Sequence, residues 1–315
     1  MQPKDAHDVA RAMLDCSPTI VIRGYREADV LSLIDYIRSV YPLLFHLGNI
    51  TYDIYANHDA VLRPQYVMEK TAFQNLLQQV TKKVSEIQAE AKQYKSELLQ
   101  EKYIHDYFCK HVRYADVGME SHSILGPLLW GHGVCEGVAK AVQLLLKSVG
   151  IEAFLLAGTS QSEETAPPEP HAWNVVQIDG KWYHLDVTFD MTISSGYVRY
   201  DYFNVNSTAI SGDHVLTFDP GQKAPLCTSG EDIFVLTNRC FKNAREAGLL
   251  FRSLLITKKQ YLHFRMEGPY NDKQSKEIFR EFEETIRICK KQLSYSYSIN
   301  KHRNVYAFYI NHSYE

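Results

Sequence analysis

The stretch from residue 65 to residue 117 contains neither glycine nor proline, and this constrains the fold more than any other feature of the chain. It is rich in Lys, Glu, Gln, Ala and Leu, which favour helix. Apolar residues recur at helical spacing in two groups, one before Tyr94 and one after Ser96. We therefore predict two helices with a break near Tyr94 to Ser96. One long, kinked helix is the alternative.

Shorter α/β patterns flank this helical stretch. On its N-terminal side the sequence predicts strands at 19–23, 50–55 and 61–66 around a helix at 27–41. After residue 190 the chain is predicted to be irregular to about residue 230. Beyond that point, alternating patterns predict strands at 233–236, 261–266, 295–299 and 305–310 and helices at 241–257 and 272–292.

The length of 315 residues is enough for two or three folding units. We place the boundaries of these units where the pattern of predicted helices and strands changes. We expect an N-terminal α/β module at 1–68, a linking helix at 69–95, a catalytic core at 96–230 and a C-terminal α/β module at 231–315. The flanking modules are candidates for binding other proteins.

Charge and cysteine usage limit the partners and the compartment. The net charge of −3 gives no reason to expect nucleic acid or an anionic membrane surface. No apolar stretch approaches the roughly 18 residues of a membrane span, and no secretion signal is visible at the N-terminus. The six cysteines are scattered without CxxC spacing. We expect reduced thiols in a cytoplasmic protein, unless an export signal has been removed.

Cys135 is the candidate nucleophile. It stands in a glycine-rich turn, residues 131–137, that leads into an apolar helix predicted at 135–149 with Gly150 as its stop. A helix start has unpaired N–H groups and a partial positive charge, and both favour a thiolate. The Cys135 N–H is also a plausible oxyanion donor. The glycines at 131, 133 and 137 are expected to let a substrate backbone approach closely.

His171 and Asp186 are the candidate base and its orienting carboxylate. Asp179-Gly180 is typical of a two-residue hairpin turn, and the strand that returns from it is predicted over 182–188. Pairing Ile178 with Lys181 makes His171 and Asp186 diagonal neighbours on one face, within reach of each other. Asp190 is a substitute for Asp186 in this role.

The other polar residues near these motifs have weaker signals. A second oxyanion donor is not identifiable, although Tyr114, Trp130 and His132 are candidates. His184 shares the His171 face but is expected to pack or to bond backbone, and His105-Asp106 to be a structural pair. The loop at 159–170 is either a lid or an ordinary surface loop.

A zinc site is disfavoured. His132 and Cys135 have a His-x-x-Cys spacing, with His105 and His111 upstream, but this is only a partial ligand set. We expect no metal and no cofactor.

At these residues the chain resembles the transglutaminase-like superfamily, and it is most similar to the bacterial, cytokinesis-associated transglutaminase/protease-like group. The resemblance covers about residues 96–205. It implies an α+β, papain-like core in which the Cys-bearing helix packs on an antiparallel sheet, and a Cys135, His171, Asp186 triad. The motifs that carry it are Ile104-His105-Asp106-Tyr107, Gly133-Val134-Cys135-Glu136-Gly137, His171-Ala172-Trp173-Asn174 and Trp182-Tyr183-His184-Leu185-Asp186-Val187-Thr188.

These observations predict a cysteine peptidase, amidase or acyltransferase that acts on peptide or protein amides through a thioester. Hydrolysis is slightly favoured over amine transfer, because no dedicated acceptor site is visible. An arylamine-type acetyltransferase is a rival enzyme class. A non-catalytic interaction scaffold on the same core is the rival from another class, since fold does not fix function.

Overall fold

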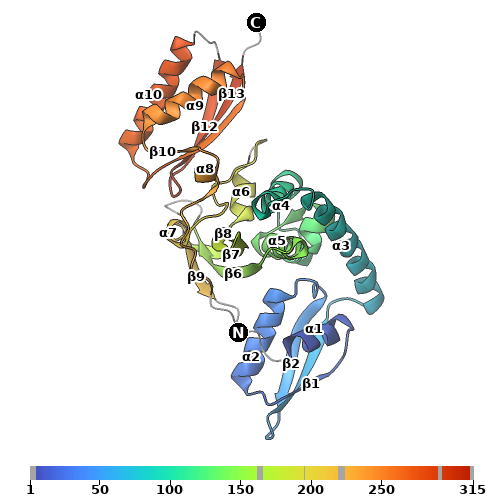
Figure 1. Ribbon diagram of the computed structural model, residues 1–315. Coiled ribbons are helices and arrows are strands. Elements are labelled where there is room, and N and C mark those ends of the chain that lie inside the picture. The colour runs from blue at the N-terminus through green and yellow to red at the C-terminus, as the bar shows by residue number, and fades with distance from the viewer. Residues whose placement is uncertain (1–4, 162–165, 195, 219–223, 290–292, 313–315) are drawn as a thin grey trace.

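The protein is described here by a computed structural model that covers residues 5–161, 166–194, 196–218, 224–289 and 293–312. Figure 1 shows three parts along the molecule, with the first strands and helices at one end and the last ones at the other. Each part has its own sheet and its own hydrophobic cluster. The division of the chain at residues 68, 95 and 230 stays a prediction.

The N-terminal module, residues 5–66, is a three-stranded antiparallel sheet, in the order β1-β3-β2, with two helices packed on it. Its strands and the second helix match the predicted ones. The first helix was not predicted, although its buried residues Ala6, Val9, Ala10 and Met13 recur at helical spacing. The elements are α1 (Ala6–Leu14), β1 (Ile20–Arg23), α2 (Glu27–Val40), β2 (Leu47–Ile54) and β3 (Asp59–Tyr66).

Two helices, α3 (Lys70–Ala91) and α4 (Glu97–His111), follow, which confirms the predicted break. Ser96 begins the second helix, because its side chain accepts a hydrogen bond from the Leu99 N–H. Within the parts of the chain that the structure describes, no helix is long and apolar enough to cross a membrane.

The core, residues 70–218, contains α5 packed on an antiparallel sheet in the order β8-β7-β6-β9 (Figure 1). This confirms the predicted α+β class. The helix ends where predicted, since Gly150 adopts a left-handed conformation with φ 98°. The remaining elements are β4 (Arg113–Tyr114), η1 (Met119–His122), η2 (Gly126–Trp130), β5 (His132–Gly133), α5 (Cys135–Val149), β6 (Ala153–Ser160), β7 (Glu169–Ile178), β8 (Lys181–Leu185), α6 (Val187–Ile193), α7 (Ser207–Ile210) and β9 (His214–Phe218).

The hairpin β7–β8 has the predicted register, with Ile178 opposite Lys181. The predicted strand at 182–188 is too long, however. It ends at Leu185, and Asp186 instead caps α6 by accepting a hydrogen bond from the Phe189 N–H. A capping carboxylate ends strand pairing at that point, because the next residues turn into helix.

Two other predictions in the core are wrong. The predicted loop at 159–170 is shorter, because β6 and β7 pair as far as Ser160 and Glu169, and residues 162–165 lie outside the described residues. The region predicted as irregular, 191–230, contains α7 and β9. The latter adds a fourth strand to the sheet, beside β6.

The C-terminal module, residues 233–312, packs two helices against a four-stranded sheet in the order β10-β11-β13-β12. Its predicted helices and last three strands are confirmed, but residues 233–236 form a helix, not a strand. Asp232 caps this short helix by accepting from the N–H groups of Phe234 and Val235. The elements are α8 (Ile233–Leu236), β10 (Cys240–Phe241), α9 (Ala244–Ile256), β11 (Tyr261–Met266), α10 (Asp272–Ile288), β12 (Leu293–Asn300) and β13 (Val305–His312).

Candidate active site

Cys135 is the first residue of α5, the position predicted for a thiol at a helix start. The residue before it, Val134, is the N-cap, and its apolar side chain makes no capping hydrogen bond. The first-turn N–H groups of a helix have no intrahelical partner, so those of α5 lack the usual polar cap. Cys135 is half-buried, and as the first residue of α5 it lies at the helix end that carries a partial positive charge.

The glycines around Cys135 make room for the protein's own chain, and their expected role in the approach of a substrate stays a prediction. A Cβ added at Gly137 would lie 2.2 Å from the Ser121 carbonyl oxygen, and one at Gly133 would lie 3.2 Å from Pro127 Cδ. Gly131 has φ +70°, a conformation that side chains other than glycine rarely adopt. These residues therefore fix the turn that presents the thiol.

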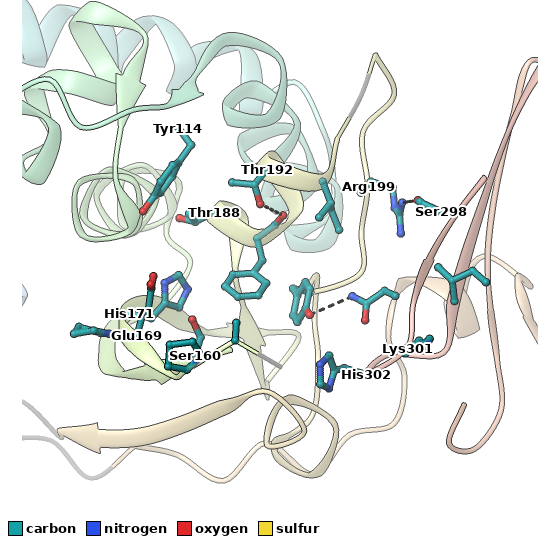
Figure 2. A pocket seen from close by; sticks show the side chains of 18 residues that line it. Tyr114, Ser160, Glu169, His171, Thr188, Thr192, Arg199, Ser298, Lys301 and His302 are labelled. Carbon is teal, nitrogen blue, oxygen red and sulfur yellow. Dashed lines mark hydrogen bonds between the residues drawn. The ribbon is translucent and has the colours of Figure 1, made fainter. Parts of the chain in front are cut away.

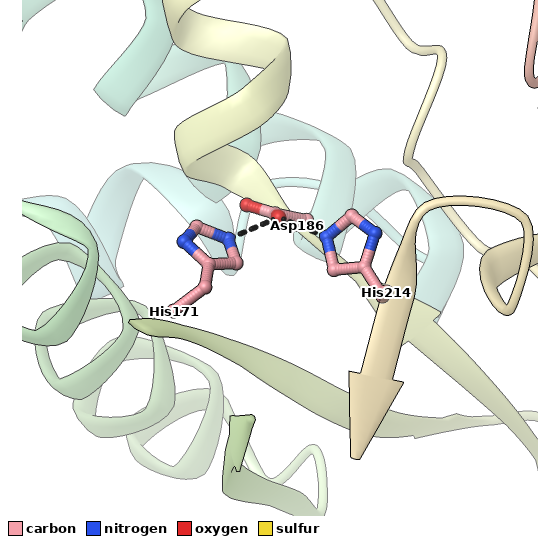
Figure 3. Close-up of side chains that lie close together, drawn as sticks. All are labelled: His171, Asp186 and His214. Atoms are coloured by element: carbon pink, nitrogen blue, oxygen red, sulfur yellow. Dashed lines mark hydrogen bonds and ion pairs between the residues drawn. The ribbon is translucent and has the colours of Figure 1, made fainter. Parts of the chain in front are cut away.

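His171 on β7 and Asp186 at the start of α6 are brought together as predicted. His171 Nε2 lies 2.6 Å from Asp186 Oδ2, and Figure 3 shows the second ring nitrogen of His171 on the far side of the ring. The other carboxylate oxygen, Oδ1, accepts from the Phe189 N–H at 3.0 Å. Asp186 is 1% exposed and His171 9% exposed, so this pair is shielded from water.

In this pair, each side chain stabilises the charged form of the other, which burial alone would disfavour. Burial lowers the pKa of His171, but Asp186 and Cys135 outweigh it and raise that pKa to about 10. Burial raises the pKa of Asp186, but His171 and His214 outweigh it and hold that pKa well below its usual range. An imidazolium between a carboxylate and a thiol is the charge state that favours a thiolate.

Cys135 and His171 line one cavity of about 780 Å³. The facing wall comes from α2 and the segment after it in the N-terminal module, including Arg38, Tyr41 and Phe45. A concave cavity lined by a candidate nucleophile and a candidate base is the usual form of an active site.

A second cavity of about 740 Å³ also has His171 in its lining (Figure 2). Its far wall comes from the C-terminal module, through Ser298 on β12 and Lys301 and His302 in the turn that follows. Both cavities share Tyr114, Pro170 and His171. The candidate base therefore lies where two cavities, each closed by a different flanking module, meet.

Of the three candidate oxyanion donors, Tyr114 is the one beside the site. Burial raises the pKa of Tyr114, the charge of Cys135 raises it further, and both residues line the first cavity. Figure 2 shows its ring extending toward His171. Trp130 stacks on His132 instead, and His132 Nδ1 lies 3.2 Å from Ser121 Oγ; neither residue lines the two cavities.

Asp190, the substitute orienter, does not reach His171. Its Oδ2 lies 3.1 Å from His105 Nε2, and its carboxylate accepts from the Tyr202 N–H at 3.0 Å. His105 also contacts Asp106, at 3.3 Å, as expected of a structural pair. His184 accepts a hydrogen bond from Trp173 Nε1 and contacts Ser207 Oγ at 3.1 Å, so it too is used in packing.

One residue of the site was missed: His214, the first residue of β9. Its Nε2 lies 2.9 Å from Asp186 Oδ2, the oxygen that His171 also contacts. The run His-Val-Leu-Thr-Phe after Ser-Gly-Asp has the composition of a short strand after a turn, and that signal could have found it. Its place beside Asp186 depends on sheet order and could not be predicted.

Among the described residues, His171, Asp186 and His214 form the one group of three or more potential ligands whose atoms converge, all within 4.8 Å of one another. The potential zinc ligands noted in the sequence, His105, His111, His132 and Cys135, do not form such a group among the described residues.

Part of the chain is similar to a known protein family. Residues 82–187 match the family described as the transglutaminase-like superfamily. A solved structure described as "Crystal structure of a TGase" is 15% identical, with a TM-score of 0.33, and the match covers 56% of this chain and 52% of that one. A "Putative Cysteine Protease" from Cytophaga hutchinsonii is 17% identical, with a TM-score of 0.31, over 44% of this chain and 61% of that one. The chain thus spans about half to three-fifths of the length of these two proteins. A search of curated proteins found no match.

Proposed function

We propose that this protein is a cysteine-dependent acyl-transfer enzyme that acts on peptide or protein amides. The match of residues 82–187 to the transglutaminase-like superfamily supports this proposal. The observation that carries the proposal is the position of His171. One ring nitrogen is bonded to Asp186 at 2.6 Å, and the ring shares its cavity with Cys135 at an uncapped helix start. An acyl transferase needs these three roles in contact.

In the first half of the proposed reaction, the Cys135 thiolate attacks the carbonyl carbon of an amide. The oxyanion that forms is held by the Cys135 N–H and by the Tyr114 hydroxyl, which lines the same cavity. His171, as imidazolium, gives its proton to the nitrogen of the leaving amine, and the carbon–nitrogen bond breaks. The product is a thioester on Cys135.

In the second half, water or a second amine attacks the thioester carbonyl. His171, now neutral, takes the proton of the attacking molecule, and the carbon–sulfur bond breaks to regenerate the thiolate. Throughout, Asp186 keeps one ring nitrogen of His171 protonated and the other directed away from the carboxylate (Figure 3). Hydrolysis and amine transfer differ only in the attacking molecule.

The two cavities favour an extended substrate. They meet at His171 and Tyr114, so a chain crossing that point has room on both sides of the bond being cleaved. Together they are larger than a single small acyl group needs. This favours a peptide or protein amide over the small acyl donor of an arylamine-type acetyltransferase.

The test is the rate at which iodoacetamide alkylates each cysteine between pH 4.5 and pH 9, followed by mass spectrometry. We expect Cys135 to react well below the ordinary thiol pKa of about 8.5, because its thiolate is paired with the His171 imidazolium. His171→Ala is expected to remove this low-pH reactivity. Half-buried Cys289 on the same chain is the internal reference.

A second measurement joins reactivity to chemistry. A peptide library incubated with the protein and a primary amine separates hydrolysis from amine transfer by product mass, with Cys135→Ala as the control. If Cys135 titrates like a free thiol and the library stays intact, the protein is an interaction scaffold and the proposal fails.

A further inference from the structure

His214 has a carboxylate at each of its two ring nitrogens. Nε2 lies 2.9 Å from Asp186 Oδ2, and Nδ1 lies 2.6 Å from Asp213 Oδ1 (Figure 3 shows the first contact). An ionised carboxylate can only accept hydrogen bonds. Both ring nitrogens must therefore carry a proton, so His214 is an imidazolium wherever both carboxylates are ionised.

The surroundings of His214 support this charge. It is 3% exposed, and the titratable groups that face it are Asp186, Asp213, His171, His184 and Tyr202. Burial lowers the pKa of His214, but the two carboxylates outweigh it and raise that pKa. His184, by contrast, has its pKa lowered to about 4 by burial and by the charge of His214. The surroundings therefore favour the neutral form of His184 and the positively charged form of His214.

Asp213 is itself held by the C-terminal module. Its Oδ2 accepts a hydrogen bond from the Tyr202 hydroxyl, and Tyr202 Oη accepts one from Asn300 Nδ2 at 3.1 Å. Asn300 is the last residue of β12. A continuous chain of polar contacts therefore runs from His171 through Asp186, His214, Asp213 and Tyr202 to that module.

We propose that His214 is a positioning residue of the site, a second, cationic histidine that shares Asp186 with His171 and is fixed in turn by Asp213. This rests on the proposed function. Asp186 Oδ2 accepts from both histidines and Oδ1 from the Phe189 N–H, so three donors fix the plane of the carboxylate that orients His171. The positive charge of His214 also offsets part of the negative charge of Asp186. His171 is therefore less basic than it would be beside Asp186 alone, and it gives up its proton more readily.

The same three residues could be read as a metal site, but the distances favour hydrogen bonds. The nitrogens of His171 and His214 lie 2.6 Å and 2.9 Å from the carboxylate oxygen, as donors to an acceptor do. The second nitrogen of His214 is hydrogen-bonded to Asp213. This contact is compatible with both interpretations, because a carboxylate can orient a histidine cation or a histidine that binds a metal. The experiment separates the two readings.

The first measurement uses the wild-type protein labelled with 15N-histidine, with the His214 signals assigned from His214→Gln. We expect both ring nitrogens of His214 to be protonated between pH 5.5 and pH 7.5. A ring with one unprotonated nitrogen in that range overturns the proposal, as does a ring nitrogen that responds to EDTA and zinc as a metal ligand. This measurement does not depend on enzymatic activity.

The second measurement is the pH profile of Cys135 alkylation in His214→Gln, which keeps a hydrogen-bond donor but removes the charge. Loss of a positive charge raises the pKa of neighbouring acids, so we expect the midpoint of thiolate formation to move to higher pH. We expect the rate at pH 6 to fall about tenfold, the effect of moving that midpoint up by about one pH unit. Asp213→Asn is expected to change the profile in the same direction.

The matched control is His263→Gln. His263 is another buried histidine bonded to an aspartate, with Nε2 2.9 Å from Asp201 Oδ1, but it lies outside the two cavities. It is expected to lower the melting temperature without moving the Cys135 midpoint. If His214→Gln behaves like this control, His214 is merely structural and the proposal is wrong. If wild-type Cys135 titrates as a free thiol, the proposed function fails, and the 15N measurement alone decides the charge of His214.

Discussion

Tyr114 shows how much at this site depends on one side chain. It is half exposed, it lines both cavities with His171, and it shares the first of them with Cys135. A hydroxyl there can donate to an oxygen that becomes charged only during the reaction. Its contribution should therefore appear in turnover more than in substrate binding.

We expect Tyr114→Phe to lower kcat about 10²-fold and to leave KM nearly unchanged, because the donor acts on the transition state. Steady-state kinetics on the best library peptide measure both constants. Trp130→Phe is the control, since Trp130 is also half exposed but lines neither cavity. A kcat within twofold of wild type in Tyr114→Phe would exclude Tyr114 as a donor.

At the residue scale, local motifs predicted the positions of Cys135, His171 and Asp186. Cys135 is defined by its turn and helix, and the other two by a hairpin whose register follows from Asp179-Gly180. Residues that join the site from elsewhere could not be predicted. His214 comes from a strand paired with β6, and sheet order is a property of the folded chain.

Among the elements, α4 holds an unusual group, the fully buried carboxyl of Glu101. Glu101 Oε2 accepts from Asn204 Nδ2 at 2.8 Å, while Oε1 and Asn204 Oδ1 have no partner among the described residues. Burial raises the pKa of Glu101 to about 8. Near neutral pH the helix therefore carries a protonated acid in the core.

This predicts a pH dependence of stability. Between the unfolded pKa of about 4.3 and the folded pKa of about 8, Glu101 binds a proton in the folded state that it has lost in the unfolded state. The contribution of Glu101 to the free energy of unfolding therefore falls as pH rises. Glu101→Gln has no such term. We expect its free energy of unfolding, relative to wild type, to increase with pH by up to about 1.4 kcal/mol per unit.

Urea unfolding at pH 5.5, 6.5 and 7.5 measures this difference. Glu86→Gln, at an exposed position on α3, is the control and should show no such trend. Equal differences between Glu101→Gln and wild type at all three pH values would show that Glu101 is ionised in the folded state.

Long periodic helices were the most predictable elements, because α3, α5, α9 and α10 each bury an apolar stripe. Short elements were not. Residues 233–236 are apolar and read as a strand, but the Asp232 cap makes them a helical turn. Asp186 likewise ends β8 early by capping α6. In each case one capping side chain outweighs the strand pattern.

At the scale of the whole molecule, one buried aspartate joins the core to the C-terminal module. The Asp201 carboxylate accepts two hydrogen bonds from Arg199, at 2.9 and 2.7 Å, and contacts His263 Nε2 of β11 at 2.9 Å. Arg303 donates to the Asp201 carbonyl oxygen at 3.0 Å. Because all four residues are buried, the two parts are expected to unfold together.

We expect Asp201→Asn to lower the free energy of unfolding by about 3 kcal/mol, since it leaves the buried Arg199 without its charge partner. Thermal and urea unfolding, followed by circular dichroism, measure the loss. Glu284→Gln removes an exposed pair with Arg287 and should change little. A similarly small effect of Asp201→Asn would mean that this contact does not hold the modules together.

The order in which the site's residues leave the ribosome follows from the contacts described above. The thiol is made early, at residue 135, whereas the polar chain behind His171 ends at Asn300 and the second cavity is closed by residues 298–302. A nascent chain that has reached Cys135 still lacks His171, Asp186 and the cavity wall formed by residues 298–302. The proposed site can therefore be completed only when synthesis of the chain is nearly finished.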